Sequence, residues 1–333
     1  MGKNRQEKYN NPFIATFTGI IDLFRKKEPA GVLKPTDRFD GRTVLVDGAS
    51  SGLGFSVAVE VARRGAKVIM VCRSGIPGKG EEVKKQARSD DIHMLHVDYS
   101  DLSSIHRVVG DIRDQFGKID ILICNAGLVP KRSRKTPQGL EEMFMVNYLS
   151  KFIFVNLLLK ENCFRYSASG RPRIIFVSSE THRNPGEFDW DSFGVYKEYG
   201  INKSIELYGY YKLLLTTFAV ELSQRLNAGE FKCSVFALCP GPINTNIGRE
   251  APKIFLPLMK LIFVLFFRSP ARAAIPVVYL AASPDLENKP FDYLFLMSRK
   301  EANEKALNPE NGRRLWELSE TLLNSLLTTK PHE

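Results

Sequence analysis

Two pairs of tyrosine and lysine with the spacing Tyr-x-x-x-Lys lie close together in the second half of the chain. Tyr199 and Lys203 form the first pair, and Tyr208 and Lys212 form the second. Residues four apart lie on the same face of a helix, so either lysine would place its charge beside a phenol. A neighbouring positive charge lowers the pKa of a tyrosine from its usual value of about 10. A phenol tuned in this way can act as a general acid or base.

The sequence around each pair favours the second pair. Tyr208 is followed by a continuous helical pattern, KLLLTTFAVELSQRL, whereas Tyr199 precedes a glycine in a polar stretch. The chain has 11 tyrosines, so about one Tyr-x-x-x-Lys spacing is expected by accident. We therefore predict that Tyr208 and Lys212 are the functional pair and that Tyr199 is a surface residue in a loop. Tyr210 and Tyr211 have no lysine four residues later, which favours packing roles for both.

Apolar runs recur from residue 42 onward, and each ends in a turn followed by a helical pattern. Unbroken apolar strands that alternate with helices are typical of a parallel sheet covered on both faces. We predict an α/β fold with a single doubly wound (Rossmann) sheet of about seven strands, which binds its ligand at the carboxyl ends of the strands. The expected strands are 43–46, 67–72, 92–97, 119–124, 173–178, 232–238 and 292–297.

Glycines gather where the first strand meets the first helix, in the stretch VDGASSGLGFS. Gly48, Gly52 and Gly54 lie between the two elements. Glycine at such positions lets the backbone turn tightly and approach a pyrophosphate, which then rests on the N-terminus of the helix. The stretch therefore predicts a dinucleotide site, and a glycine-rich turn without a ligand is the alternative.

The end of the second strand bears on the choice of cofactor. An acidic residue there would hold the ribose 2′-hydroxyl of NAD, but positions 71–73 contain none and Arg73 follows the strand. An arginine at this place favours the 2′-phosphate of NADP, and a surface arginine without a ligand is the alternative. Asp98, after the third strand, could either bond the adenine or cap the next helix.

Charge and cysteine content narrow the classes of partner. The net charge of +10 suits an acidic partner, an anionic membrane surface or a phosphate-rich cofactor. No basic run is interleaved with aromatic residues and no Cys/His spacing suits a metal, so we expect neither nucleic-acid binding nor a metal site. The five cysteines are an odd number, mostly inside apolar runs. This indicates free thiols in a reducing, cytoplasmic compartment.

Two further apolar segments bear on location. Residues 1–40 are expected to be an N-terminal extension whose amphipathic helix, flanked by basic residues, either lies on a membrane surface or packs on its own domain. The apolar run 254–267 contains a proline and a lysine and is too short to span a bilayer. We expect a Rossmann domain over 41–300, which includes the segment 246–268, and a helical C-terminal extension over 301–333.

Several ordered motifs resemble the short-chain dehydrogenase/reductase family, most closely its retinol-dehydrogenase-like branch, over residues 41–327. Their number and order argue against chance similarity. The matching stretches are DGASSGLG (47–54), CR (72–73), DYSDLSSI (98–105), NAG (125–127), VNYLSKF (146–152), VSSETHR (177–183), YGYYK (208–212), FAVEL (218–222), CPGPINTNI (239–247), RSPARAA (268–274) and RLWELSETLL (314–323).

The resemblance implies hydride transfer between a nicotinamide and a carbonyl or alcohol carbon, with Tyr208 as the general acid or base. Lys212 would lower the pKa of Tyr208 and hold the nicotinamide ribose. Ser179, or the adjacent Ser178, would bond the substrate oxygen, and Asn147 would anchor a proton relay. The implied cofactor contacts are Gly48, Ser50, Ser51, Gly52, Leu53, Gly54, Arg73, Asp98, Asn125, Ala126, Gly127, Tyr208, Lys212, Pro240, Gly241, Ile243 and Thr245.

The chain departs from the family pattern at several positions. Asp47 stands where the family usually has threonine. A carboxylate cannot donate as a hydroxyl does and adds negative charge near a pyrophosphate, so we expect weaker cofactor binding. Tyr148 stands where this branch often has histidine, and Tyr211 where serine is usual. The interval from the serine to the tyrosine is 29 residues long, and residues 183–205 within it are expected to form a loop at the substrate mouth.

The sequence thus predicts an NADP(H)-dependent oxidoreductase for a lipophilic carbonyl or alcohol, such as a retinoid, a steroid or a long-chain aldehyde. The resemblance implies that the segment 246–268 of this Rossmann oxidoreductase domain is a substrate lid, and its apolar character indicates a lipophilic substrate. The lid, the leader and the positive charge together favour peripheral membrane contact. One alternative is a non-catalytic nucleotide-binding regulatory or scaffold protein, supported mainly by Asp47. A structural lipid-surface protein is another. Because the family often dimerises, a homodimer is one expected assembly.

Overall fold

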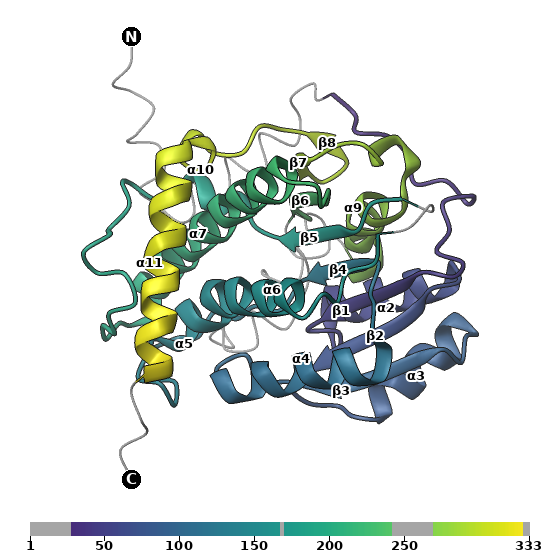
Figure 1. Ribbon diagram of the computed structural model, residues 1–333, viewed down its shortest axis with the longest axis horizontal. Coiled ribbons are helices and arrows are strands. Elements are labelled where there is room, and N and C mark those ends of the chain that lie inside the picture. The colour runs from purple at the N-terminus through teal and green to yellow at the C-terminus, as the bar shows by residue number, and fades with distance from the viewer. Residues whose placement is uncertain (1–27, 167–169, 242–268, 329–333) are drawn as a thin grey trace, which may run out of the picture.

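A computed structural model describes residues 28–166, 170–241 and 269–328 of the chain (Figure 1). One mixed sheet runs through the molecule in the order β3-β2-β1-β4-β5-β6-β7-β8. All neighbouring strands are parallel except β7 and β8. The strands are β1 (Thr43–Asp47), β2 (Lys67–Cys72), β3 (Ile92–His96), β4 (Ile121–Cys124), β5 (Arg173–Val177), β6 (Ser234–Cys239), β7 (Phe291–Phe295) and β8 (Ser298–Arg299).

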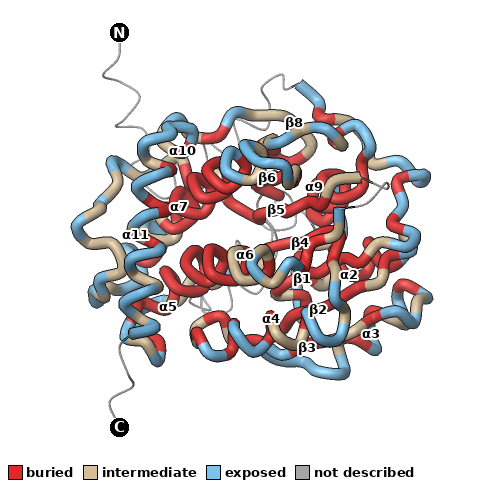
Figure 2. Tube along the Cα trace, in the orientation of Figure 1, coloured by how far each residue is buried: buried red, intermediate tan, exposed pale blue. Residues whose placement is uncertain are grey.

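Helices cover both faces of the sheet, which is why the strand sequences are apolar throughout. β1, β4, β5 and β6 are buried along their whole length, as Figure 2 shows for the centre of the molecule. One face of the sheet is covered by α2 (Gly52–Arg63), α3 (Gly78–Ala87) and α9 (Pro270–Ala282). The other face is covered by α4 (Leu102–Phe116), α6 (Ser150–Lys160) and α7 (Ile201–Ala228).

The remaining elements are short or C-terminal. α5 (Glu142–Phe144), a π-helical turn η2 (Met145–Leu149) and α6 run on continuously, and a 3₁₀ turn η3 (Glu180–Arg183) follows β5. After the short 3₁₀ turn η6 (Pro284–Leu286) and the last strands, α10 (Glu304–Leu307) leads into α11 (Pro309–Thr328). In Figure 1, α11 lies at the edge of the molecule, where it packs on α7.

The chain order reverses direction in the sheet between β1 and β4. β2 and β3 lie on one side of β1, and β4 to β8 lie on the other. Parallel sheets of this kind bind ligands at such a switch point, outside the carboxyl ends of the strands. The glycine-rich turn after β1 and the NAG stretch after β4 therefore meet at this point.

Three expectations about the elements need correction. The sheet has an eighth strand, β8, which is only two residues long and antiparallel to β7. α7 begins at Ile201, so Tyr208 lies two turns inside the helix rather than at its start. The aspartate that caps α4 is Asp101, whose side chain accepts the N–H of Ser103, and not Asp98.

One helical stretch of the described residues, Glu142–Lys160, is long and apolar enough to cross a membrane, but 78% of it is buried inside the protein. Residues on all its sides pack in the core, since Met143, Tyr148 and Phe154 are each fully buried. It is therefore the core helix of this fold. The leader up to residue 27 and the expected lid at 246–268 lie outside the described residues.

Candidate active site

The turn after β1 is shaped to receive a phosphate group. Gly48 and Gly52 both have φ of +59°, a conformation that favours glycine. A Cβ on Gly54 would lie 2.5 Å from the Gly48 carbonyl oxygen and from Asn125 Nδ2, so only glycine fits there. Ser51, the N-cap of α2, makes no capping bond with its side chain, and the first turn has no acidic residue. The N–H groups of this helix end are thus available to an anion.

Asp47 does not leave an uncompensated charge beneath this turn. Its Oδ1 accepts the backbone N–H groups of Asn125 and Ala126. Its Oδ2 forms an ion pair with Lys151 Nζ at 2.8 Å. Both side chains are buried, at 0% and 1% exposure. The carboxylate therefore joins β1 to the NAG stretch, and the expectation that it adds negative charge to the pyrophosphate site is wrong, because Lys151 neutralises it.

Lys151 is the residue of this region that sequence reasoning missed. Its ammonium also lies 3.5 Å from the centre of the Tyr99 ring, where the π-face offers further stabilisation. A signal was present, because a lysine inside the apolar stretch SKFIFVNLLL must be paired if the helix is buried. Only the three-dimensional structure identifies Asp47, 104 residues away, as the partner.

Lys212 lies at the centre of the second half of the site. Its Nζ donates to the Val177 carbonyl oxygen at 2.8 Å and lies 5.6 Å from the centre of the Tyr208 ring. A Cβ built on Gly127 would lie 2.9 Å from Asn147 Oδ1 and 3.7 Å from Lys212 Nζ. Gly127 thus lies close to the side chains of both Asn147 and Lys212, so the three residues meet in one place.

Ser179, and not Ser178, faces the tyrosine. Ser178 Oγ is bonded to Thr216 Oγ1 at 2.7 Å inside the core. Ser179 is the N-cap of η3, where its Oγ accepts the Thr181 N–H at 3.3 Å, and its hydroxyl lies close enough to Tyr208 to influence the pKa of the phenol. Of the two serines, Ser178 is thus bonded inside the core and Ser179 is the one near the tyrosine.

Gly209 allows α7 and η3 to approach closely. A Cβ at this position would lie 2.8 Å from the Thr181 carbonyl oxygen, so any larger residue would push the two elements apart. The helix carries Tyr208, and the 3₁₀ turn follows directly on Ser179. This close approach brings the elements that hold the two hydroxyls together, and the sequence alone did not single it out.

Asn147 is held by two hydrogen bonds to the backbone of Leu128. Its Oδ1 accepts the N–H of Leu128 and its Nδ2 donates to the Leu128 carbonyl oxygen, both at 2.8 Å. It lies in the π-helical turn η2, and such turns often occur at functional sites. Oδ1 keeps a second lone pair with which to accept a bond.

The electrostatics of the tyrosine and the lysine differ from the sequence expectation. Burial raises the pKa of Tyr208 and the neighbouring Cys239 adds to the rise, while the nearby Ser179 hydroxyl opposes it. The expected lowering by Lys212 is therefore not the net result in this structure. Burial, followed by repulsion from Lys151, lowers the pKa of Lys212 to about 8. The lysine remains mostly protonated at pH 7.

Tyr199 and Lys203, the competing Tyr-x-x-x-Lys pair, bond to different partners in the structure. The Tyr199 hydroxyl donates to Glu141 Oε1 at 2.6 Å, and the exposed Lys203 pairs with Glu206. Tyr199 is in a loop as predicted, but it is half-buried and bonded rather than a free surface residue. Tyr211 packs on Phe144 in the core, as expected.

The other expected cofactor residues are distributed around the same edge of the sheet. Ser50 and Leu53 belong to the glycine turn and the start of α2. Arg73 is exposed directly after β2. Asp98 accepts bonds from Ser100 N and Oγ. Pro240 and Gly241 follow β6, whereas Ile243 and Thr245 lie outside the described residues.

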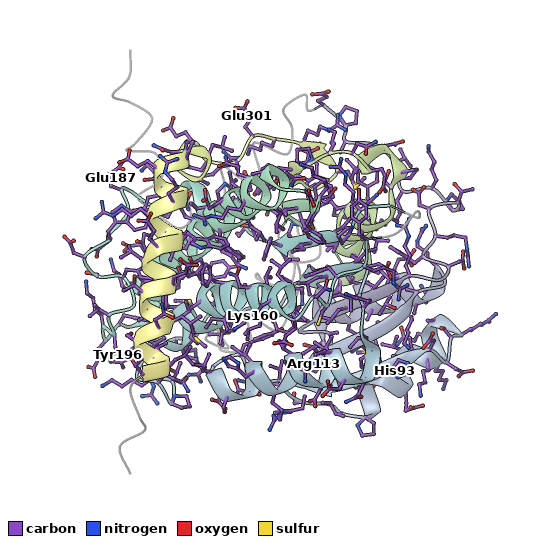
Figure 3. The ribbon with its side chains drawn as sticks, viewed as in Figure 1. His93, Arg113, Lys160, Glu187, Tyr196 and Glu301 are labelled. Atoms are coloured by element: carbon purple, nitrogen blue, oxygen red, sulfur yellow. The ribbon has the colours of Figure 1, made fainter. Side chains whose placement is uncertain are left out.

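The expected loop beyond Ser179 is present from residue 184 to 200, and residues 201–205 form the first turn of α7 instead. Glu187 and Tyr196 of this loop, both labelled in Figure 3, lie at the periphery of the molecule. An open hollow of about 670 Å³ is lined by Arg132, Ser133, Arg134, Tyr196, Glu198 and Tyr199. The loop thus reaches residues 132–134, which lie between the NAG stretch and Asn147 in the chain.

Comparison with known proteins places these features in a family. A model described as short chain dehydrogenase matches residues 42–196. Retinol dehydrogenase 14 of Mus musculus is 33% identical over 302 residues, covering 86% of this chain and 87% of that protein. Retinol dehydrogenase 13 of Homo sapiens is 31% identical over 316 residues, covering 93% of each.

A solved structure of an uncharacterized protein from Mycobacterium Paratuberculosis superposes with a TM-score of 0.67 at 29% identity, covering 88% of this chain and 98% of that one. Structures with this fold have been solved with NADP and with NAD. From its sheet, its glycine turn and its relatives over most of its length, we conclude that the chain belongs to the short-chain dehydrogenase/reductase family of nicotinamide-dependent oxidoreductases that interconvert CH–OH and C=O groups.

Proposed function

We propose that this protein is an NADP(H)-dependent oxidoreductase acting on a lipophilic carbonyl or alcohol. The observation that carries the proposal is the meeting of Ser179, Tyr208 and Lys212 beside the glycine-rich turn. Asn147 lies next to Lys212 across Gly127. These groups could bind, orient and protonate a substrate oxygen at the carboxyl edge of the sheet.

Each side chain has a role that its contacts support. When bound, the nicotinamide would exchange a hydride with the substrate carbon. In reduction, the Tyr208 hydroxyl would donate a proton to the substrate oxygen while Ser179 Oγ bonds the same oxygen. Lys212 uses one N–H on Val177 and has two left for the tyrosine oxygen and a ribose hydroxyl. Asn147 would hold a water that returns the proton.

The preference for NADP(H) rests on Arg73. The Arg73 side chain is exposed at the end of β2. The glycine-rich turn lies beside this strand, because the N–H of Gly48 donates to the carbonyl oxygen of Val71. No acidic residue lies at positions 71–73. Arg73→Ala should weaken NADPH binding about 10-fold while leaving NADH binding within about twofold. Equal losses for both cofactors, measured by nucleotide fluorescence titration, would contradict this preference.

The lipophilic substrate is supported by the relatives named as retinol dehydrogenases and by the apolar run 254–267 of the sequence. We propose that this run is a lid and that the protein works on the cytosolic face of a membrane, with leader and lid in contact with it. Flotation with anionic vesicles tests the location. Protein that stays at the bottom of the gradient would contradict it.

The first experiment is NADPH oxidation by the purified protein, with NADH in parallel, against retinal, steroid ketones and medium to long aldehydes. Tyr208→Phe and Tyr199→Phe form a matched pair, because each removes one hydroxyl from a Tyr-x-x-x-Lys motif. We expect turnover to be lost only with Tyr208→Phe. Loss with Tyr199→Phe instead would place the chemistry elsewhere.

The non-catalytic alternative loses its main support in the structure. It depended on the charge of Asp47, which is paired with Lys151. Tight NADPH binding without turnover of any tested carbonyl would nevertheless favour it over the proposed activity.

A further inference from the structure

His182 is buried beside the candidate catalytic serine and uses both of its ring nitrogens. The residue is fully buried in η3. Its Nδ1 lies 2.6 Å from the carbonyl oxygen of Ser179, and its Nε2 lies 3.1 Å from the backbone nitrogen of Asn303. A carbonyl oxygen only accepts and a backbone N–H only donates. The ring is therefore neutral, with its proton on Nδ1.

The partner on the far side of this ring belongs to the C-terminal extension. Asn303 is the N-cap of α10, where its own side chain accepts the N–H of Lys305. His182 thus links the backbone of Ser179 to a segment 121 residues further along the chain. Because the imidazole is rigid and bonded at both ends, it holds the start of η3 in place.

A second buried bond joins the same extension to the turn that carries Asn147. The Tyr148 hydroxyl lies 2.6 Å from Ser319 Oγ in α11, and neither residue is exposed. Ser319 Oγ gives its single proton to the carbonyl oxygen of Leu315. The tyrosine is consequently the donor, and its ring and hydroxyl tie η2 to α11.

We propose that two residues of the C-terminal extension, Asn303 and Ser319, position the active site, acting through His182 on Ser179 and through Tyr148 on Asn147. This inference rests on the proposed function. The two turns concerned are only four and five residues long; η2 carries Asn147, and η3 follows directly on Ser179. The apolar docking of α11 occurs elsewhere, where Trp316 packs on Phe152 and Phe218.

His182→Phe tests the first link, because it keeps a ring of similar size and removes both bonds. We expect kcat to fall about 10-fold or more, with KM and the Kd for NADPH changed less than about twofold. His182→Gln retains an amide donor and a carbonyl acceptor and should recover part of kcat. A fall in kcat with no recovery by glutamine would contradict the hydrogen-bonded role.

Tyr148→Phe and Ser319→Ala test the second link. Each removes one hydroxyl of a single bond, so each should lower kcat about 3- to 10-fold. The double variant should be no worse than the more affected single one, as expected for two residues that act together. Additive losses would show that the two hydroxyls act independently and would overturn this link.

Trp316→Leu is the matched control, since it loosens the packing of α11 without touching either bond. It should lower the melting temperature yet leave kcat unchanged well below that temperature. If Trp316→Leu and His182→Phe reduced kcat equally at equal loss of stability, the role of the segment would be structural and the proposal wrong.

A readout without turnover separates this inference from the proposed function. The Thr181 N–H bonds Ser179 Oγ, and the Leu128 N–H bonds Asn147 Oδ1. Amide hydrogen exchange should speed up about 10-fold or more at Thr181 in His182→Phe and at Leu128 in Tyr148→Phe, but at neither in Trp316→Leu. Unchanged exchange at both sites would overturn the positioning role even in an active enzyme. Faster exchange in a protein that reduces no carbonyl would keep it and reject the activity.

Discussion

Two lysines, Lys151 and Lys212, are buried within the same protein, but they meet different surroundings. Lys151 faces the carboxylate of Asp47 at 2.8 Å and the ring of Tyr99. Lys212 donates to a backbone carbonyl and forms no ion pair with a carboxylate among the described residues. The first lysine has its charge matched inside the protein, while the second keeps donors that point at no fixed anion.

This difference indicates how one fold separates stability from chemistry. A buried ion pair with good geometry is hard to break, because either partner alone would be an uncompensated charge. A buried lysine without a counter-ion is easier to deprotonate and keeps bonds for a ligand. The glycine-rich turn therefore rests on the ion pair of Asp47 and Lys151. In the proposed function, the reacting oxygen would be served by Lys212, which has no such partner among the described residues.

The largest expected effect is that of replacing Lys212. Lys212→Met should lower kcat about 10³-fold, because the charge near the tyrosine and the donors for a ribose are both lost. The melting temperature should stay the same or rise, since a desolvated charge is removed. Steady-state kinetics and thermal unfolding check the two parts, and a large loss of stability would contradict a lysine without a counter-ion.

Lys151→Met should do the opposite. It leaves Asp47 buried without its partner, so the free energy of unfolding should fall by about 3–5 kcal/mol. Asp47→Thr combined with Lys151→Met removes both charges and should recover most of that loss. Urea unfolding of the two variants tests this, and a double variant no more stable than Lys151→Met would argue against a coupled pair.

The pH dependence of stability sharpens the comparison. The pKa of Lys212 is lowered from 10.5 to about 8 by burial. Between these values the unfolded chain holds a proton on this lysine that the folded protein has released, so stability rises with pH. Relative to Lys212→Met, the wild type should gain on the order of 2–3 kcal/mol from pH 8 to pH 10.5. Parallel stability curves would contradict the lowered pKa.

The smallest effect is expected at Gly209, on the side of Lys212. Gly209→Ala should separate α7 from the Thr181 carbonyl oxygen and misplace Tyr208 against Ser179. We expect kcat to fall about 10- to 30-fold, with the Kd for NADPH little changed. Gly229→Ala is the control, because a Cβ there meets nothing within 4 Å. Equal effects of the two substitutions would show that the close contact is unimportant.

The sequence predicted most of the sheet because each strand is a local apolar run. β2 spans the expected residues 67–72, and the others agree to within two residues at each end. The glycine turn was likewise visible, since glycines between a strand and a helix have few other reasons to cluster. β8 was missed because two residues carry no pattern.

Contacts between distant residues were not predictable in the same way. Asp47 could be recognised as unusual, but its neutralisation depends on Lys151 on another element. Ser178 and Ser179 have the same side chain, and only the bond to Thr216 shows which one points into the core. The start of α7 was misplaced because its first two turns are mostly exposed, so the unbroken apolar pattern begins later than the helix.

The order of synthesis gives the bond between His182 and Asn303 a further meaning. A growing chain that has passed β7 already contains Ser179, Tyr208 and Lys212. It still lacks the residues that hold η2 and η3, since Ser319 follows Tyr148 by 171 residues. In the proposed role of these bonds, η2 and η3 are fixed only once Ser319 has been added, later than any strand of the sheet.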